Sequence, residues 1–435
     1  MKYYSLTDKN NTASFSEAVI RGLASDRGLY FPENISRLDE VFLQDLTNKS
    51  MVEIGVEVMR PFVGGTIPDD RLIKIVTDTL CFDFPVNKVN DNTATLELFH
   101  GPTMAFKDVG ARFMARCIGY FNEQSPKKVT VLVATSGDTG GAVASGFLGI
   151  EGAEVIILYP KGKVSHIQEL QLTTNGKNIK AVEVDGVFDD CQEIVKSAFI
   201  DKDLKRKLNL TSANSINVAR WLPQSLYFFF AYQQFKRLGI DKKLVFSVPS
   251  GNFGNICAGI VAKRLGLPIN HFIASTNIND TVPRYLQTQN YQPNPSKQTI
   301  SNAMDVGNPS NFIRIQSLYK NDFDSLKQDF SSYAYDDAET KLALAELHQK
   351  HNYVADPHGA VGYLGLQDFL KKNPDYYGIF LETAHPIKFR DTVEDTLGLT
   401  LDIPTQIQNI LDKTPEKTSL RGYKAFKEYL LNQAI

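Results

Sequence analysis

The sequence lacks several features that would place the protein in common structural classes. Its four cysteines, Cys81, Cys117, Cys191 and Cys257, lie far apart and form no C-x-x-C pair, so a disulfide framework is not expected. No run approaches the roughly 20 apolar residues of a transmembrane helix, and the first residues lack the apolar core of a signal peptide. These absences predict a soluble, cytoplasmic protein that does not bind membranes.

The chain also has little excess charge of either sign. Its 435 residues include 47 basic and 49 acidic side chains, which give a net charge of −2. This near balance provides no electrostatic footprint for nucleic acid. We therefore expect no nucleic-acid partner, while the choice between a monomer and a homodimer stays open.

Motifs for metal binding and for serine hydrolases are missing as well. His348 and His351 are one helical turn apart, but neither an H-E-x-x-H motif nor a set of cysteines accompanies them. No G-x-S-x-G elbow is found. The sequence therefore predicts no metal site.

What the sequence does contain is a regular alternation of strand and helix patterns. With 43% apolar residues it can form a substantial core. Helical patterns separate the predicted strands, which span residues 94–99, 129–134, 155–158, 179–184, 244–248, 271–275 and 378–381. Such alternation is typical of an α/β fold with doubly wound parallel sheets. Two such sets predict two α/β domains with a ligand cleft between them.

These patterns divide the chain into three expected regions. Residues 1–93 are predicted to form a mostly helical N-terminal region without a series of strands. Residues 94–213 form a smaller α/β domain, and residues 214–435 a larger one. The polar segment 290–325 is expected to be a loop at the edge of the cleft or on the surface.

A lysine stands at the start of one predicted helix. Val109, Phe113 and Cys117 share an apolar helical face. Asp108 is a plausible N-cap, which places Lys107 just before the helix. An apolar setting lowers the pKa of a lysine amine and makes it a better nucleophile toward an aldehyde. A solvated lysine is the alternative.

Two glycine-containing turns each follow a predicted buried strand and open a helix. They read Ser136-Gly137-Asp138-Thr139-Gly140 and Ser250-Gly251-Asn252-Phe253-Gly254-Asn255. Backbone N–H groups in such turns can bind phosphate or polar ligands at the carboxyl ends of parallel strands. The second turn is not a P-loop, because no Gly-Lys-Ser/Thr follows. An ordinary tight turn is the alternative for each.

Two further polar clusters complete the candidate site. Ser215 and Asn217 precede a predicted helix with Arg220 in its first turn, where the arginine suits a second bound anion. The alternative is an N-capped helix with a surface arginine. Thr383 follows the strand 378–381, and its hydroxyl would leave a pyridine nitrogen unprotonated. A nucleophilic lysine together with phosphate-binding turns is what pyridoxal 5'-phosphate (PLP) requires, so the set predicts a PLP enzyme.

In order along the chain, these stretches resemble those of threonine synthases of the shorter bacterial and fungal type, within the fold-type-II PLP family. The matching stretches cover residues 14–19, 28–32, 101–108, 134–140, 248–255, 279–284, 301–306, 356–361 and 383–386. Each one is modest, whereas the ordered set is highly specific.

The resemblance implies a role for each candidate residue. It makes Lys107 the residue that binds PLP covalently, and it assigns the cofactor phosphate to Gly251, Asn252, Phe253, Gly254 and Asn255. It implies that Asp138, in an undetermined protonation state, faces the ring hydroxyl and that Thr383 faces the pyridine nitrogen. It places Ser136 and Thr139 near the substrate carboxylate, and Ser215, Asn217 and Arg220 at the substrate phosphate.

The resemblance also implies an activity. It predicts that O-phospho-L-homoserine and water are converted to L-threonine and phosphate by γ-elimination and β-addition of water, with Lys107 as general acid–base. Another fold-type-II lyase, such as threonine dehydratase, and a non-catalytic relative that binds PLP or phosphorylated ligands are the alternatives. Gly141 and Gly146 stand where such enzymes often carry larger residues, which predicts looser helix packing there.

Overall fold

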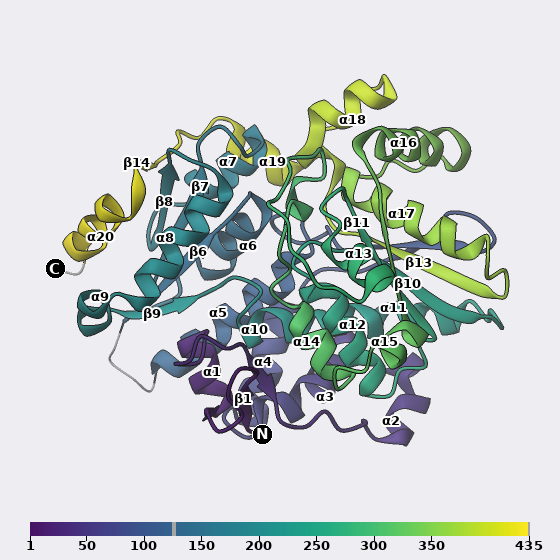
Figure 1. Ribbon diagram of the computed structural model, residues 1–435, viewed down its shortest axis with the longest axis horizontal. Helices are drawn as coiled ribbons and strands as arrows, with labels where there is room; N and C mark the ends of the chain where they lie inside the picture. The colour runs from purple at the N-terminus through teal and green to yellow at the C-terminus, as the bar shows by residue number, and fades with distance from the viewer. Residues whose placement is uncertain (124–127, 434–435) are drawn as a thin grey trace.

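The computed structural model describes residues 1–123 and 128–433 and shows an α/β fold built on two mainly parallel sheets (Figure 1). The larger sheet has six strands in the order β12-β11-β10-β13-β5-β4. Its strands are β4 (Val86–Lys88), β5 (Thr93–Glu97), β10 (Lys243–Pro249), β11 (His271–Thr276), β12 (Phe330–Ala334) and β13 (Tyr376–Glu382). Only the edge strand β4 runs antiparallel to its neighbour within this described sheet.

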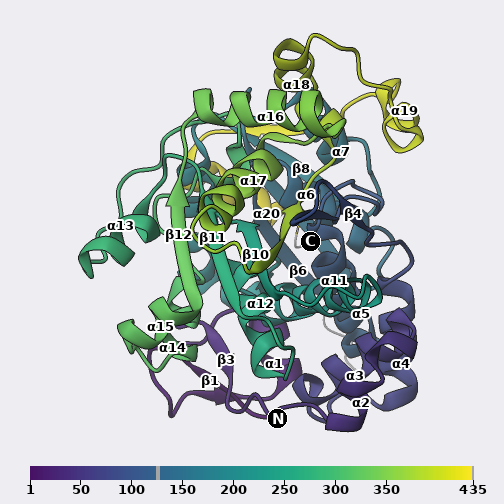
Figure 2. The same ribbon diagram turned by 90° about the vertical axis from the view of Figure 1, so that its right-hand side faces the viewer.

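Helices cover both faces of the larger sheet (Figure 2). On one face α16 (Asp337–His351) and α17 (Pro357–Leu370) pack against Val245, Ile273 and Phe380. The opposite face carries α11 (Ser225–Arg237) and α12 (Gly254–Arg264). Because successive strand residues point to opposite faces and both faces are covered, residues 244–249 of the central strand β10 are all buried, whereas Lys243 at its start is exposed.

The smaller sheet has five parallel strands in the order β14-β8-β7-β6-β9. Its strands are β6 (Val129–Ala134), β7 (Ala153–Pro160), β8 (Ile179–Val184), β9 (Asn209–Ser212) and β14 (Thr418–Leu420). One face packs against α6 (Asp138–Phe147), which lies on α5 (Lys107–Glu123). The other face packs against α8 (Phe188–Ile200) and α20 (Gly422–Gln433). The prediction of an α/β fold with doubly wound parallel sheets is confirmed.

The remaining elements connect and cover these layers. They are β1 (Tyr3–Ser5), β2 (Thr12–Ala13), α1 (Phe15–Arg21), β3 (Tyr30–Pro32), α2 (Glu40–Gln44), η1 (Leu46–Asn48), α3 (Met51–Val63), α4 (Asp69–Thr79), α7 (His166–Thr173), α9 (Lys202–Lys207), α10 (Val218–Trp221), η2 (Leu222–Gln224), α13 (Thr281–Thr288), η3 (Asn302–Met304), α14 (Phe312–Leu318), α15 (Phe323–Asp329), η4 (Pro386–Phe389), α18 (Arg390–Leu397) and α19 (Thr405–Leu411). No helix in this described part of the chain is long and apolar enough to cross a membrane.

The N-terminal region corrects one prediction. The expectation that residues 1–93 contain no series of strands is wrong, because β2, β1 and β3 form a small antiparallel sheet and β4 belongs to the larger sheet. The strands were missed because each is only two or three residues long, too short for a period to show.

Sheet membership also differs from the expected division of the chain. The strand predicted at 94–99 is β5, which pairs with β13 of the larger sheet and not with the smaller sheet that the range 94–213 implied. At the other end of the chain, β14 pairs with β8 of the smaller sheet. Pairing between strands so distant in sequence leaves no local pattern.

Helices α5 and α6 pack closely at Gly146, where the sequence predicted loose packing. A methyl group on Gly146 would lie 3.0–3.2 Å from backbone atoms of Ala111 and Arg112. The expectation of looser packing there is therefore wrong, because the missing side chain lets the two helix backbones approach. The segment 290–325 likewise contains helices α14 and part of α15 and is not loop throughout.

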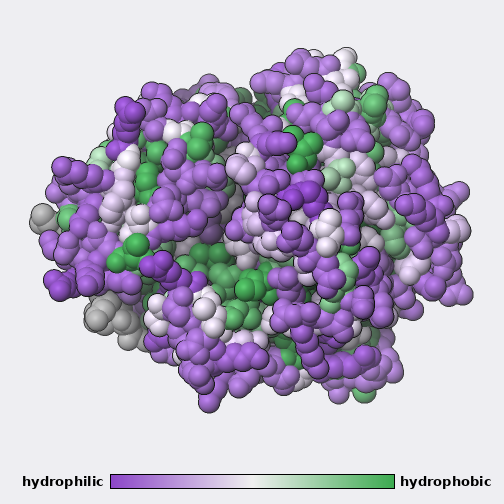
Figure 3. Space-filling model, in the orientation of Figure 1, coloured by the Kyte–Doolittle hydropathy of each residue, from purple (hydrophilic) through white to green (hydrophobic). Residues whose placement is uncertain are grey.

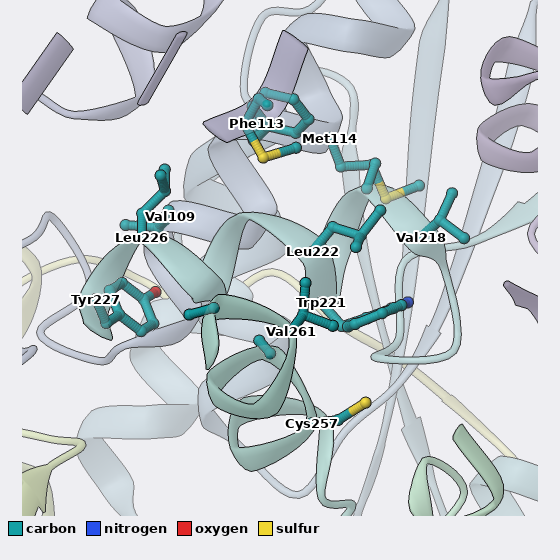
Figure 4. Packing of buried hydrophobic residues seen from close by; sticks show 14 of the residues in the cluster. Val109, Phe113, Met114, Val218, Trp221, Leu222, Leu226, Tyr227, Cys257 and Val261 are labelled. Carbon is teal, nitrogen blue, oxygen red and sulfur yellow. The ribbon is translucent and has the colours of Figure 1, made fainter. Parts of the chain in front are cut away.

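An apolar cluster supports the start of α5 from below (Figure 4). Val109 and Phe113 of α5 belong to the same buried cluster as Trp221 and Leu226 of the α10–η2–α11 run and Val261 of α12. All of these side chains are buried. Burial of this kind contributes about 1.5–3 kcal/mol to the stability of the fold for each large apolar side chain. This packing holds the N-terminal part of α5 in place.

Candidate active site

A cavity opens between the two sheets, where the surface is hollowed in Figure 3. It lies at the carboxyl ends of β6, β10 and β13, the usual ligand position in an open α/β sheet. Among its lining residues are Lys107, Ser136, Thr139, Asn214, Ser215, Arg220, Gln224, Gly251, Asn252, Phe253, Gly254, Asn255, Asn302, Asp305, His358 and Thr383. Most of the predicted site residues therefore meet in one place.

Lys107 is the first residue of α5, and Asp108 lies within the helix. The prediction that Asp108 caps the helix is wrong. Its buried carboxylate turns back and accepts hydrogen bonds from the backbone N–H and the hydroxyl of Thr103. Asp108 thereby fixes the turn that leads into Lys107.

The amine of Lys107 has no hydrogen bond or ion pair within residues 1–123 and 128–433. Its nitrogen lies 5.6 Å from the ring centroid of Phe106. Burial lowers the pKa of Lys107 to about 8, with Asp138 opposing the shift and Lys388 and Arg220 reinforcing it. About a tenth of the amine is therefore neutral and nucleophilic at pH 7, far more than for an exposed lysine.

The turn from Gly251 to Asn255 presents unused backbone donors to the cavity. Helix α12 begins at Gly254, and Phe253 has a φ of 61°, in the left-handed region. None of the backbone N–H groups of these five residues has a hydrogen-bond partner in the described structure. Gly251 is required by space, because a methyl group there would lie 2.7 Å from the carbonyl oxygen of Ala303. Such a cluster of free N–H groups at a helix N-terminus suits a phosphate.

The first glycine turn offers two hydroxyls. The side chain of Thr135 accepts hydrogen bonds from the N–H groups of Gly137 and Gly140, each at 2.9 Å, and so holds the turn. Ser136 and Thr139 line the cavity, and neither hydroxyl is engaged by another described residue. Both are available to a polar ligand.

Asp138 belongs to the same turn as Ser136 and Thr139, but its side chain does not line the cavity. Its carboxylate is 2.8 Å from the amine of Lys388, and Gln168 donates a hydrogen bond to it at 2.9 Å. Burial would raise the pKa of Asp138, but Lys388 and Lys107 hold it well below its usual range. Asp138 is therefore a carboxylate at neutral pH.

The polar cluster of Ser215, Asn217 and Arg220 is only partly at the cavity. Ser215 and Arg220 line the cavity, but Asn217 does not. The Asn217 amide donates to the carbonyls of Val19 and Ser212 and accepts from the N–H of Ala219, so it caps α10 and is used up structurally. We correct the prediction for Asn217: its side chain is turned away from the cavity.

Arg220 is buried and is not a surface residue. One of its Nη atoms donates to the carbonyl of Ala213, whereas its Nε has no partner in the described structure. Burial lowers the pKa of Arg220 to about 10, which leaves it cationic at neutral pH. A buried cation beside a cavity favours an anionic ligand.

Thr383 connects the larger sheet to the lysine segment. It directly follows β13, and its carbonyl accepts a hydrogen bond from the N–H of Phe106 at 2.9 Å. Its side chain lines the cavity, and no other described group bonds to its hydroxyl. The hydroxyl can therefore serve a ligand that binds in the cavity with Lys107.

Sequence reasoning missed several lining residues. Gln224 and Asn302 each have a buried side-chain oxygen with no partner in the described structure. His358 lines the cavity, accepts a hydrogen bond from the N–H of Ala303 and is bound to Asp356 through Nδ1. Asn302 and His358 lie in the stretches on which the family resemblance rests, so that resemblance could have identified them as site residues. No comparable feature of the sequence pointed to Lys388, the partner of Asp138.

These observations fit PLP. The amine of Lys107 with its lowered pKa, the free N–H groups at α12 and the hydroxyl of Thr383 face one cavity, as the aldehyde, phosphate and ring nitrogen of that cofactor require. No group of three or more His, Cys, Asp or Glu side chains in residues 1–123 and 128–433 is placed to hold a metal.

Comparison with known proteins gives a consistent result over the full length. Residues 89–375 match the model of pyridoxal-phosphate-dependent enzymes, residues 2–80 that of the threonine synthase N terminus, and residues 359–430 that of the threonine synthase C-terminal region. The chain is 44% identical over 412 residues to threonine synthase from Escherichia coli, covering 95% of each protein.

Solved structures agree. The crystal structure of threonine synthase from Escherichia coli superposes with a TM-score of 0.93 at 42% identity and covers 100% of both chains. The PLP-bound threonine synthase from Brucella melitensis gives a TM-score of 0.93 at 34% identity, covering 100% of this chain and 99% of its own. With the cavity chemistry above, these matches show that the chain belongs to the threonine synthase family of PLP-dependent enzymes.

Proposed function

We propose that the protein converts O-phospho-L-homoserine and water to L-threonine and inorganic phosphate. The observation that carries this proposal is that one cavity holds a buried cation, Arg220, in addition to the free N–H groups of the turn 251–255. The free N–H groups of residues 251–255 suit the phosphate of PLP, and Ser215 with Arg220 suits a second phosphate. A PLP lyase that acts on an unphosphorylated amino acid needs only the first.

The residues around the cavity divide the work. Lys107 holds the cofactor and then carries protons on its Nζ, a task for which a pKa near 8 is well matched. The hydroxyls of Ser136 and Thr139 bind the substrate carboxylate. Arg220 and Ser215 bind the phosphate before and after it leaves. PLP supplies the electron sink that stabilises the carbanionic charge formed when the α-proton is removed.

Asp138 and Thr383 set the electrostatics around the cofactor. The carboxylate of Asp138, kept ionised by Lys388, is a negative charge near Lys107. The neutral hydroxyl of Thr383 imposes no charge at the opposite side. We propose that this pair determines where the cofactor's proton resides.

The test is a product assay on the purified holoenzyme. With O-phospho-L-homoserine we expect phosphate and L-threonine in a 1:1 ratio. Production of 2-oxobutanoate from threonine without phosphate release would instead indicate a dehydratase. Cofactor binding without any product would indicate a non-catalytic relative. Either result would overturn the proposal.

The cellular setting follows from the cysteines. All four are free, and only Cys81 is exposed. Unpaired cysteines are typical of a reducing compartment, and we propose that the protein acts in the cytoplasm.

A further inference from the structure

Two buried arginines donate hydrogen bonds to backbone carbonyls of the segment 213–216. Arg220, which is 2% exposed, donates to the carbonyl of Ala213, as described above. Arg314 of α14 is 0% exposed and donates to the carbonyls of Ser215 at 3.2 Å and Ile216 at 2.6 Å. Its guanidinium also lies 4.8 Å from the ring of Trp221.

Neither arginine has an ion-pair partner in the described residues. Arg314 is bound only by carbonyls, an amide oxygen and an aromatic face, all of them uncharged. A buried charge without a counterion is costly. Two such cations around Ser215 therefore produce a positive potential that an anion in the adjacent cavity would offset.

Hydrogen bonds through Asn311 connect Arg314 to Ser215, which lines the cavity. The amide oxygen of Asn311 accepts a hydrogen bond from Nη1 of Arg314. Its nitrogen donates to the hydroxyl oxygen of Ser215 at 3.2 Å and to the carbonyl of Asn252 at 3.0 Å. The opposite amide orientation would set N–H groups against the guanidinium and an oxygen against a carbonyl, so this orientation is the favourable one.

The direction of this chain has a chemical consequence. Because the Ser215 oxygen accepts from Asn311, its own hydrogen is free to point into the cavity that Ser215 lines. The chain Arg314–Asn311–Ser215 thus presents a donor at its end. Resting on the proposed function, we infer that Asn311 is a specificity-determining positioning residue, which with Arg314 makes Ser215 a donor to an acceptor-only group such as a phosphate ester.

The second N–H of Asn311 gives the residue a second role. It holds the carbonyl of Asn252, which belongs to the turn assigned to the cofactor phosphate. The backbone N–H of Asn311 donates to the same carbonyl at 3.1 Å. One residue therefore couples the two anion-binding features.

The experiment is a double-mutant cycle on the holoenzyme with inorganic phosphate as the probe. Ser215→Ala and Asn311→Ala are each expected to weaken phosphate binding about 5–20-fold, the range for one charge-assisted hydrogen bond. The double variant should bind phosphate no more than about twofold more weakly than Ser215→Ala, because Asn311 acts through Ser215. Calorimetric titration measures all four affinities.

Matched variants separate this role from simple structural support. Asn311→Asp keeps the size and the acceptor for Arg314 but cannot donate to Ser215, so it should lose phosphate affinity as Asn311→Ala does. Ser310→Ala lies on the same segment and removes a contact to the side chain of Asn252 without touching Ser215. It should leave phosphate affinity unchanged. In substrate assays KM should rise in the Asn311 variants while kcat changes little.

The outcomes are distinguishable. Unchanged phosphate affinity in both Asn311 variants, or an equal loss in the presence and absence of Ser215, would overturn the inference. If the wild-type protein binds phosphate with the predicted coupling but releases none from O-phospho-L-homoserine, only the proposed function fails. If it turns over substrate but shows no coupling, only the inference fails.

Discussion

At the scale of single residues, Lys107 shows how position creates reactivity. The sequence marks it as a lysine beside Phe106, and the fold partly shields its amine from water and leaves it without a partner in the described structure. Desolvation disfavours the charged form of a lysine and therefore lowers its pKa. The same side chain on the surface would be almost fully protonated at neutral pH.

This pKa gives a measurable pH dependence. Only the neutral amine attacks the PLP aldehyde, so the rate at which apoenzyme captures added PLP should rise from pH 7 and level off above about pH 9, following a pKa of about 8. Stopped-flow absorbance follows the reaction. Nα-acetyl-lysine, measured in parallel, corrects for ionisation of PLP itself and should keep rising past pH 10. A protein profile parallel to that of the model compound would contradict the assignment.

At the scale of elements, α5 positions the lysine through its contact with α10. Gly110 of α5 lies against the backbone of Arg220, so close that a methyl group there would overlap the Arg220 carbonyl oxygen. A methyl group on Gly119, further along α5, would have only the Ile150 side chain of the described residues within 4 Å outside its own helix, at 3.5 Å. The same helix therefore has one position where only glycine fits, Gly110, and one where a larger residue can be accommodated, Gly119.

The two glycines predict opposite effects of one substitution. Gly110→Ala should destabilise the protein by about 1–3 kcal/mol, because the backbones must separate, and it should weaken phosphate binding by displacing Arg220. Gly119→Ala should stabilise by about 0.5–1 kcal/mol, since alanine favours a helix more than glycine does. Urea unfolding of the apoenzyme measures both. Equal effects would refute the close contact at Gly110.

At the scale of the whole molecule, the chain passes between the sheets more than once. It forms β5 in the larger sheet before reaching α5 and returns at the end to add β14 and α20 to the smaller one. Near the cavity the crossing segments are joined: His385 donates to the Met104 carbonyl, and Lys388 binds both Thr103 and Asp138. The position of Lys107 is therefore fixed from both sheets.

The C-terminal helix is a structural part of the smaller sheet. Phe426 of α20 is 1% exposed and packs in the cluster that contains Leu132 and Ile156. Phe426→Ala should destabilise the protein by about 3–5 kcal/mol. Leu342→Ala, at a side chain that is 71% exposed, should change stability by no more than about 0.5 kcal/mol. Thermal unfolding compares the two, and a small effect at Phe426 would show that α20 is dispensable.

Local patterns predicted much of this protein. The strands predicted at 129–134 and 179–184 coincide with β6 and β8, because buried β-branched runs need no distant partner to be recognised. The glycine turns and Lys107 were likewise visible as short motifs that reach the cavity. Asn217 shows the limit: its residue type suited a ligand, but two backbone carbonyls and a helix N-terminus already occupy its amide.

By itself, therefore, the sequence determined most of the strand–helix alternation and pointed to Lys107 and to the glycine turns that reach the cavity, since these depend on neighbours within a few residues. Only the tertiary structure decided which sheet β5 and β14 join, that Lys388 keeps Asp138 ionised, and that Asn311 and Arg314, from a segment that looked like loop, stand behind Ser215. Burial and hydrogen-bond partners supplied by distant segments set these features, and such partners leave no period in the chain.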